Sequence, residues 1–200
     1  MIWLICAIAI WGVVHSWLAS LGVKAYVRRA LGEQAGRTYR LAYNVFSVIS
    51  FVPILLLLRM LPDRVLYAVQ APWLYVMLAL QGLALIGLFV GVLQTGPTSF
   101  IGLRQLFSGE SAPALVVDGL YRWIRHPLYF FGLLLLWLTP RLTQNMLAAY
   151  IAFTAYLVIG ALFEERKLMR EFGSAYADYR SRTPMFIPFL SFGKRHTLRP

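Results

Sequence analysis

The chain has little charge and almost no cysteine. Only 14% of its 200 residues are Asp, Glu, Lys or Arg, whereas soluble domains carry about 25%. The single cysteine, Cys6, excludes an intrachain disulfide framework, a CxxC redox motif and a thiolate metal site, and it leaves the compartment open. Hydrophobic residues make up 60% of the chain, and the mean hydropathy is +0.66. These properties exclude an ordinary soluble domain and predict an all-α integral membrane protein.

Apolar residues are concentrated in five segments, which we expect to be transmembrane helices. Four are long enough for the roughly 20 residues that cross a hydrocarbon core, and the fourth in order is shorter. A turn at 139–142 makes the last two segments a tight helical hairpin. The N-terminus lacks the basic start and cleavage site of a signal peptide, so the first segment is predicted to be a retained span. The segments cover 2–21, 41–61, 71–93, 127–139 and 142–163.

The net charge of +11 follows a pattern typical of membrane orientation. Most basic residues fall between the first and second segments, between the third and fourth, and after the fifth. The opposite side holds Arg59, Arg64 and Arg141. The positive-inside rule then predicts an N-terminus outside and a C-terminus in the cytoplasm. Because orientation accounts for most of the charge, the expected partner is the lipid bilayer and not nucleic acid.

We predict one membrane domain over 1–200, in which 1–93 forms three N-terminal helices and 94–200 forms the half that carries the site. This second half contains a cytoplasmic loop rich in turn formers, at 94–125. Its tail has apolar residues at helical spacing, which predicts an amphipathic helix that ends before Pro184. These residues are Leu168, Phe172, Tyr176 and Tyr179.

The hairpin brings two polar groups to the same depth. Arg125 and His126 precede the fourth segment, and Glu164 and Glu165 follow the fifth. Taken singly, each suits a membrane anchor or a solvated helix end. Ionisable groups at this depth are costly unless paired or functional, so their clustering favours a polar pocket. Four tyrosines belong either to the pocket or to an interfacial belt: Tyr121, Tyr129, Tyr176 and Tyr179.

Such a pocket offers carboxylates for an ammonium group, cations for a carboxylate and aromatic faces for a sulfonium or a nucleobase. The backbone of "PALVVDG" at 113–119 adds hydrogen-bonding groups for a purine edge. S-adenosylmethionine has all of these features. A nucleotide or a zwitterionic lipid headgroup also fits, so the residues alone leave the ligand open.

The ordered motifs "GLYRWIRHPLY", "EERKL" and "FGSAYADYRSRTPMFIPFL", within 113–190, resemble the isoprenylcysteine carboxyl methyltransferase superfamily of integral-membrane methyltransferases. That superfamily includes phospholipid methyltransferases and bacterial thiol S-methyltransferases. The pattern is most similar to the bacterial branch of methanethiol S-methyltransferases and nitric-oxide-metabolism-associated membrane proteins, which implies a location in a bacterial inner membrane. The similarity to this branch rests on "HSWLAS" at 15–20, "YRLAYNVFS" at 39–47 and "WLTPRLTQNML" at 137–147.

The resemblance implies S-adenosylmethionine as the cofactor and assigns roles by position. The backbone at 113–116 would hold the adenosine, Glu164 would bind the amino group, and the histidine motif would line the site. The implied cofactor-binding residues are Pro113, Ala114, Leu115, Val116, Tyr121, His126, Pro127, Leu128, Tyr129 and Glu164. The implied catalytic residues are Arg125 and Arg182, which would organise the cofactor carboxylate or the acceptor, and Glu165, which would support Glu164.

Two departures from the family pattern bear on the methyl acceptor. Phe131 stands where the family often has a small residue, and Gly160 stands where the prenylcysteine enzymes have an arginine that serves the acceptor. The second departure argues against a prenylcysteine. The expected reaction is in-line transfer of a methyl group to a small thiol or to a lipophilic or lipid acceptor, which needs mainly proximity and exclusion of water.

Other interpretations stay open at this point. One is a nicotinamide-dependent membrane reductase of the sterol-reductase type, and another is a non-catalytic assembly or regulatory protein with the same fold. Arg104 and Gln105 either close over the cofactor or form an ordinary loop turn. His15, inside the first segment, is expected to be a hydrogen-bonded core residue and not a ligand.

Overall fold

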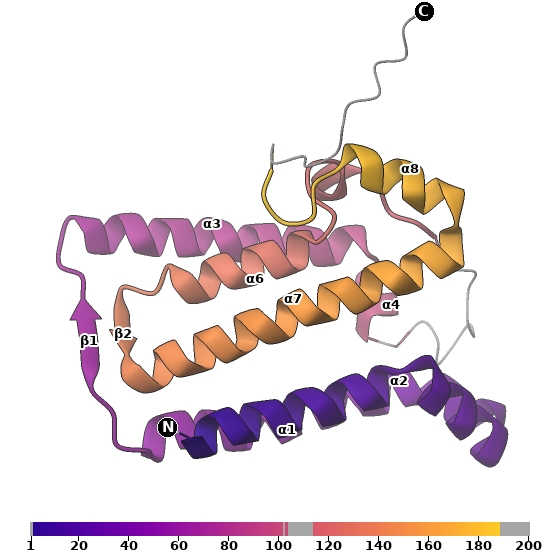
Figure 1. Ribbon diagram of the computed structural model, residues 1–200, viewed down its shortest axis with the longest axis horizontal. Helices are drawn as coiled ribbons and strands as arrows, with labels where there is room; N and C mark the ends of the chain where they lie inside the picture. The colour runs from indigo at the N-terminus through magenta and orange to yellow at the C-terminus, as the bar shows by residue number, and fades with distance from the viewer. Residues whose placement is uncertain (1, 102, 104–113, 189–200) are drawn as a thin grey trace, which may run out of the picture.

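The computed structural model describes residues 2–101, 103 and 114–188. Predictions that concern Arg104, Gln105 and Pro113 lie outside these residues. The elements follow in the order α1 (Ile2–Ala19), α2 (Leu21–Met60), β1 (Val65–Ala68), α3 (Trp73–Gln94), α4 (Pro97–Ile101), η1 (Gly119–Arg122), α6 (Pro127–Trp137), β2 (Arg141–Thr143), α7 (Gln144–Phe172) and α8 (Ser174–Arg182) (Figure 1).

The all-α membrane architecture predicted from the sequence is confirmed. In the described residues, α1, α2, α3 and α7 are long and apolar enough to cross a membrane, and α6 is a shorter apolar helix. The outer surfaces of these helices carry large exposed apolar side chains, such as Trp3, Val48 and Phe89. Such surfaces require a lipid environment, because in water they would remain unburied.

The long helices form two groups. Helix α1 packs against both α2 and α7, while α6 packs against α3 (Figure 1). The buried centre of the first group consists of Leu4, Ile8, Ile54 and Ala149. Figure 1 shows α8 at the end of the bundle where α6 begins, and β1 and β2 at the opposite end.

Two helices are longer than the apolar runs predict. Helix α2 begins at Leu21, where Ser20 caps it by accepting a hydrogen bond from the Val23 amide. It includes most of the stretch predicted to connect the first two spans, and Gly32 interrupts it with a φ of 86°, which L-residues rarely adopt. Helix α7 continues to Phe172. Its continuation, "EERKLMREF", consists largely of strong helix formers, so Glu164 and Glu165 lie within a helix and not at its end.

The turn expected between the last two segments contains a strand. β2 pairs antiparallel with β1, which lies between α2 and α3. Asp63 joins this end to α7, because its Oδ1 accepts hydrogen bonds from the amides of Arg64 (2.8 Å) and Asn145 (3.0 Å). The start of α7 is therefore held by residues about 80 positions earlier in the chain.

Helix α6 packs more extensively against α3 than against α7, its partner in the predicted hairpin. A methyl group added at Gly87 would lie 2.6 Å from the ring of Phe131, and one added at Gly91 would lie 2.7 Å from Leu128. The two glycines thus allow α6 to approach α3 closely. Phe131, the departure from the family pattern, faces α3 and fills the space above Gly87.

Candidate functional site

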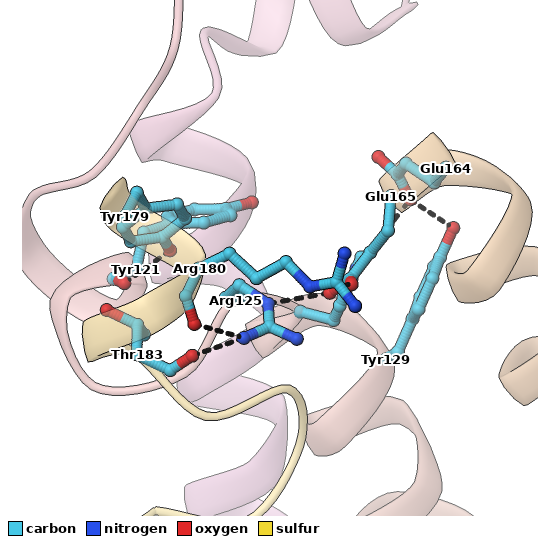
Figure 2. A network of polar contacts seen from close by, with 9 residues as sticks. Tyr121, Arg125, Tyr129, Glu164, Glu165, Tyr179, Arg180 and Thr183 are labelled. Atoms are coloured by element: carbon cyan, nitrogen blue, oxygen red, sulfur yellow. Dashed lines mark hydrogen bonds and ion pairs between the residues drawn. The ribbon is translucent and has the colours of Figure 1, made fainter. Parts of the chain in front are cut away.

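The polar residues predicted to meet do so where η1 leads into α6, beside α7 and under α8 (Figure 2). Pro127 occupies the first turn of α6, where its missing N–H group costs no hydrogen bond. The helix therefore begins directly after His126. Arg125 and His126, the two residues before it, lie against Glu165 and Glu164 of α7.

Glu165 is the buried acid of the pair, with a side chain that is 6% exposed. Its Oε1 accepts a hydrogen bond from Nε of Arg125 at 2.6 Å and lies 3.3 Å from Nε2 of His126. Its Oε2 lies 3.4 Å from Nε of Arg180 on α8. A buried carboxylate needs this degree of pairing, because loss of hydration is otherwise uncompensated.

Arg125 links the start of α6 to α8 and the segment that follows. Besides Glu165, its Nη1 donates to the carbonyl oxygens of Arg180 and Thr183 (Figure 2). The backbone continues the contact, since the Arg125 amide donates to the Pro184 carbonyl (2.9 Å) and the His126 amide donates to the Met185 carbonyl (3.2 Å). The Arg125 side chain is 9% exposed, so its main contacts are within the protein.

His126 lies between two aromatic rings and faces both acids. Its ring stacks on that of Tyr129, with centroids 5.3 Å apart and planes 4° apart, and Phe186 lies on it at 5.7 Å. Nε2 points to Glu165, and Nδ1 lies 3.7 Å from Oε2 of Glu164. The imidazole thereby holds Tyr129 in a fixed position beside α7.

Glu164 differs from its neighbour because its side chain is 46% exposed. Its Oε2 accepts a hydrogen bond from the Tyr129 hydroxyl at 2.8 Å (Figure 2). Among the described residues, no hydrogen bond to its other oxygen occurs. The accessible carboxylate of the site is therefore Glu164, while that of Glu165 is used within the protein.

Tyr121, in η1, lies near enough to Glu164 for its charge to act on the tyrosine hydroxyl. Burial, followed by the negative charge of Glu164, raises the pKa of Tyr121 to about 12. The hydroxyl of Tyr179 in α8 donates to the Tyr121 carbonyl at 2.6 Å. At Gly119, φ is 61° and an added methyl group would collide with the Gln94 amide, so glycine is required for this turn. The preceding backbone, Ala114 to Val117, has no regular secondary structure.

Five of the predicted site residues come together: Arg125, His126, Tyr129, Glu164 and Glu165. Leu128 instead packs against Gly91 of α3, and Arg182 does not join the cluster. Arg182 is exposed, and its Nε donates to the Asp178 carbonyl one turn earlier. The arginine that approaches Glu165 is Arg180, which sequence reasoning missed. Arg180 and Arg182 each lie one helical turn after a buried tyrosine, Tyr176 and Tyr179 respectively, so spacing alone does not separate them. The tail segment that pairs with 125–126 has no comparable sequence signal.

A protein-family model, described as NnrU protein, matches residues 3–185. The chain belongs to the NnrU family. This membership confirms the resemblance to integral-membrane methyltransferases of the isoprenylcysteine carboxyl methyltransferase type, as do the curated relatives.

Three of these relatives show the extent of the similarity of this NnrU protein. A Pseudomonas deceptionensis protein named methanethiol S-methyltransferase is 31% identical over 195 residues, which cover 92% of this chain and 71% of that protein. A Mycobacterium tuberculosis protein of the same name is 29% identical over 95% of this chain and 78% of that protein. Methanethiol S-methyltransferase 2 of Bradyrhizobium diazoefficiens is 43% identical over 48% of this chain, and the match spans 39% of that protein. No solved structure matches the chain.

Proposed function

We propose that this NnrU protein is a membrane methyltransferase that takes its methyl group from S-adenosylmethionine and transfers it to a small thiol. The observation that carries the proposal is the division of the acid pair. Glu165 is buried and paired within the protein, while Glu164 presents a half-exposed carboxylate that is hydrogen-bonded to Tyr129. The names of the relatives support the enzyme class and a thiol acceptor.

The chemistry of this set of residues fits S-adenosylmethionine. In the proposal, the Glu164 carboxylate receives the ammonium group, and the partly exposed ring of Tyr129, hydrogen-bonded to Glu164, offers a face to positive charge. Tyr121 and the backbone from Ala114 to Val116 line the side where the adenosine would bind. When bound, S-adenosylmethionine supplies an electrophilic methyl group on a sulfonium sulfur.

The structure suggests positioning roles for the residues that the sequence identified as catalytic. In the proposal, Arg125 and Glu165 hold α8 and the 183–186 segment against the start of α6, and thereby orient His126 and Tyr129. Arg182 lies apart from this network, so Arg180 takes its place beside Glu165.

The proposal includes the orientation predicted from the sequence, with the N-terminus outside and the C-terminus in the cytoplasm of a bacterial inner membrane. The arrangement of basic residues supports it. Arg122, Arg125 and Arg180 lie on the elements at the site end of the bundle, whereas Arg64 and Arg141 lie at the end that carries β1 and β2 (Figure 1).

Calorimetry of the detergent-purified protein tests the cofactor. We expect S-adenosylmethionine and S-adenosylhomocysteine to bind, and NADPH not to bind. Binding of NADPH without either adenosyl ligand would instead support a membrane reductase and refute the proposal. A gas-phase assay for the methyl thioether, with methanethiol as acceptor, then tests methyl transfer to a thiol.

A further inference from the structure

A second polar cluster lies within the apolar bundle, around His15 of α1. The hydroxyl of Tyr43 on α2 is 2.5 Å from Nε2 of His15. The indole of Trp11 stacks on the imidazole, with centroids 4.6 Å apart and planes 24° apart, and the ring of Tyr156 on α7 lies at 6.2 Å. An ionisable side chain within membrane spans is costly unless it is paired or functional.

One nitrogen of this histidine is not used by the fold. Nδ1 of His15 is buried and has no hydrogen-bond partner among the described residues. An unpartnered buried polar atom costs about 1–3 kcal/mol. The neighbouring indole is satisfied, because Trp11 Nε1 donates to Ser50 Oγ at 3.1 Å. The contact with Tyr43 satisfies Nε2 but leaves Nδ1 unpartnered, at a cost that a ligand bound at Nδ1 would remove.

The cluster and the carboxylate of the site share one face of α7. Tyr156, Gly160 and Glu164 are spaced four residues apart, which places them in one row over about 12 Å of helix. A methyl group added at Gly160 would have no heavy atom within 4 Å, although this glycine is partly buried. The row therefore has a carboxylate at one end, an aromatic cluster at the other and open space between them.

We propose that the acceptor, a small neutral thiol, binds beside Gly160 with its S–H group hydrogen-bonded to Nδ1 of His15, and that Nδ1 takes the thiol proton during transfer. This inference rests on the proposed function. The S–H bond breaks as the sulfur forms its bond to the methyl carbon, and the carbon–sulfonium bond breaks. Its electron pair stays on the donor sulfur, which becomes a neutral thioether, and the positive charge ends on the imidazole.

The surroundings of His15 suit both states of the imidazole. A tyrosine hydroxyl both donates and accepts. When Tyr43 accepts a hydrogen bond from Nε2–H, Nδ1 is unprotonated and able to accept a proton. After proton uptake, the stacked Trp11 ring stabilises the cation through its π face. Aromatic rings also make favourable contacts with sulfur. Because a small alkyl thiol is a weaker acid than cysteine, it is protonated at neutral pH, and a nearby base accelerates its reaction.

Two thiols of similar size and different acidity test the proton transfer. Ethanethiol is a weak acid, whereas 2,2,2-trifluoroethanethiol is largely ionised in mildly alkaline buffer. His15→Gln keeps an N–H donor for the Tyr43 hydroxyl but cannot take up a proton. We expect kcat/KM to fall about 100-fold or more for ethanethiol and less than about 10-fold for the fluorinated thiol. Equal losses for both thiols, or no loss, would overturn the proposal.

Nitrogen-15 NMR of the unmutated protein provides a readout without turnover. The chain contains three histidines, so the spectrum of histidine-labelled protein is simple. Ethanethiol, added without a methyl donor, should shift the ring-nitrogen signals of His15, which are identified by their absence in His15→Gln. If only other histidines respond, the thiol does not bind at His15.

Calorimetry with S-adenosylhomocysteine separates the two levels of inference. His15→Gln and the control Trp17→Phe, on the exposed side of the same helix, should both bind it as the wild type does. If the wild type binds no adenosyl ligand and methylates no thiol, the proposed function fails. If it does both and His15→Gln behaves like Trp17→Phe with both thiols, only the role of His15 is refuted.

Discussion

Nε of Arg125 lies 2.6 Å from Oε1 of Glu165, and both side chains are almost fully out of solvent. This ion pair joins α6 to α7, and the remaining hydrogen bonds of Arg125 join both to α8 and the segment after it. The neighbouring acid, Glu164, is left accessible beside Tyr129. Glu164 and Glu165 are consecutive residues of α7, so their side chains leave the helix in different directions. One is therefore accessible to solvent and the other is buried in the ion pair.

The two acids should respond differently to the same substitution. Glu164→Gln removes the charge proposed to bind the ammonium group, so affinity for S-adenosylhomocysteine should fall about 10- to 100-fold with little change in thermal stability. Glu165→Gln leaves Arg125 without its buried counter-charge and should lower the unfolding temperature. Calorimetry and thermal unfolding in detergent measure both effects. Equal affinity in wild type and Glu164→Gln would refute the assignment of Glu164.

Arg125→Met should destabilise the protein by about 3–5 kcal/mol, because it leaves the Glu165 carboxylate buried with less compensation. It should also release α8, so limited proteolysis should cut near Thr183 faster than in the wild type. Arg182→Met is the matched control. Its guanidinium group is exposed, and we expect a change within about 0.5 kcal/mol. Similar protease resistance of both variants would contradict the proposed linking role of Arg125.

The close approach of α3 and α6 predicts a steric effect at Gly87. Gly87→Ala should destabilise the protein by about 1–3 kcal/mol, because the new methyl group overlaps the Phe131 ring. The additional substitution Phe131→Leu should recover part of the loss. Gly82→Ala is the control in the same helix, since its added methyl group meets no atom within 4 Å. If Gly87→Ala matches this control in thermal unfolding, the packing assigned to Phe131 is incorrect.

Tyr176 should make stability sensitive to alkaline pH. Burial, and then the charge of Glu165, raises its pKa from 10.0 to about 12. The folded state thus favours the protonated hydroxyl. This contribution to stability is fully present below pH 10, where the unfolded tyrosine is also protonated, and is lost as the pH rises from 10 to about 12. Thermal unfolding over this range should show a smaller decline for Tyr176→Phe than for wild type. An identical decline would contradict the raised pKa.

Much of the fold could be predicted from the sequence because membrane insertion depends on local composition. An apolar run long enough to cross a bilayer is recognisable without its neighbours. The meeting of Arg125 and His126 with Glu165 also followed from the chain, since two consecutive antiparallel helices return to the same level. The contacts among these three residues confirm that expectation.

Other features depend on partners that are distant along the chain. Apolar periodicity does not distinguish α3 from α7 as the main neighbour of α6, because both offer apolar surfaces, and the decisive glycines lie in α3. The pairing of 184–185 with 125–126 uses backbone groups, which every sequence has. For the same reason β1 and β2 were not predicted. Arg182 was chosen in place of Arg180 because both lie one turn after a buried tyrosine, and only the packing of α8 decides which arginine approaches Glu165.

The sequence by itself determined which segments are apolar enough for the bilayer, the family, and the set of polar residues that can meet at one end. The tertiary structure decided which acid of the pair is buried, which arginine approaches it, and that Nδ1 of His15 lies unpartnered among aromatic rings. The physical reason is that composition and spacing act along one helix, whereas burial and hydrogen bonding depend on how separate helices face one another.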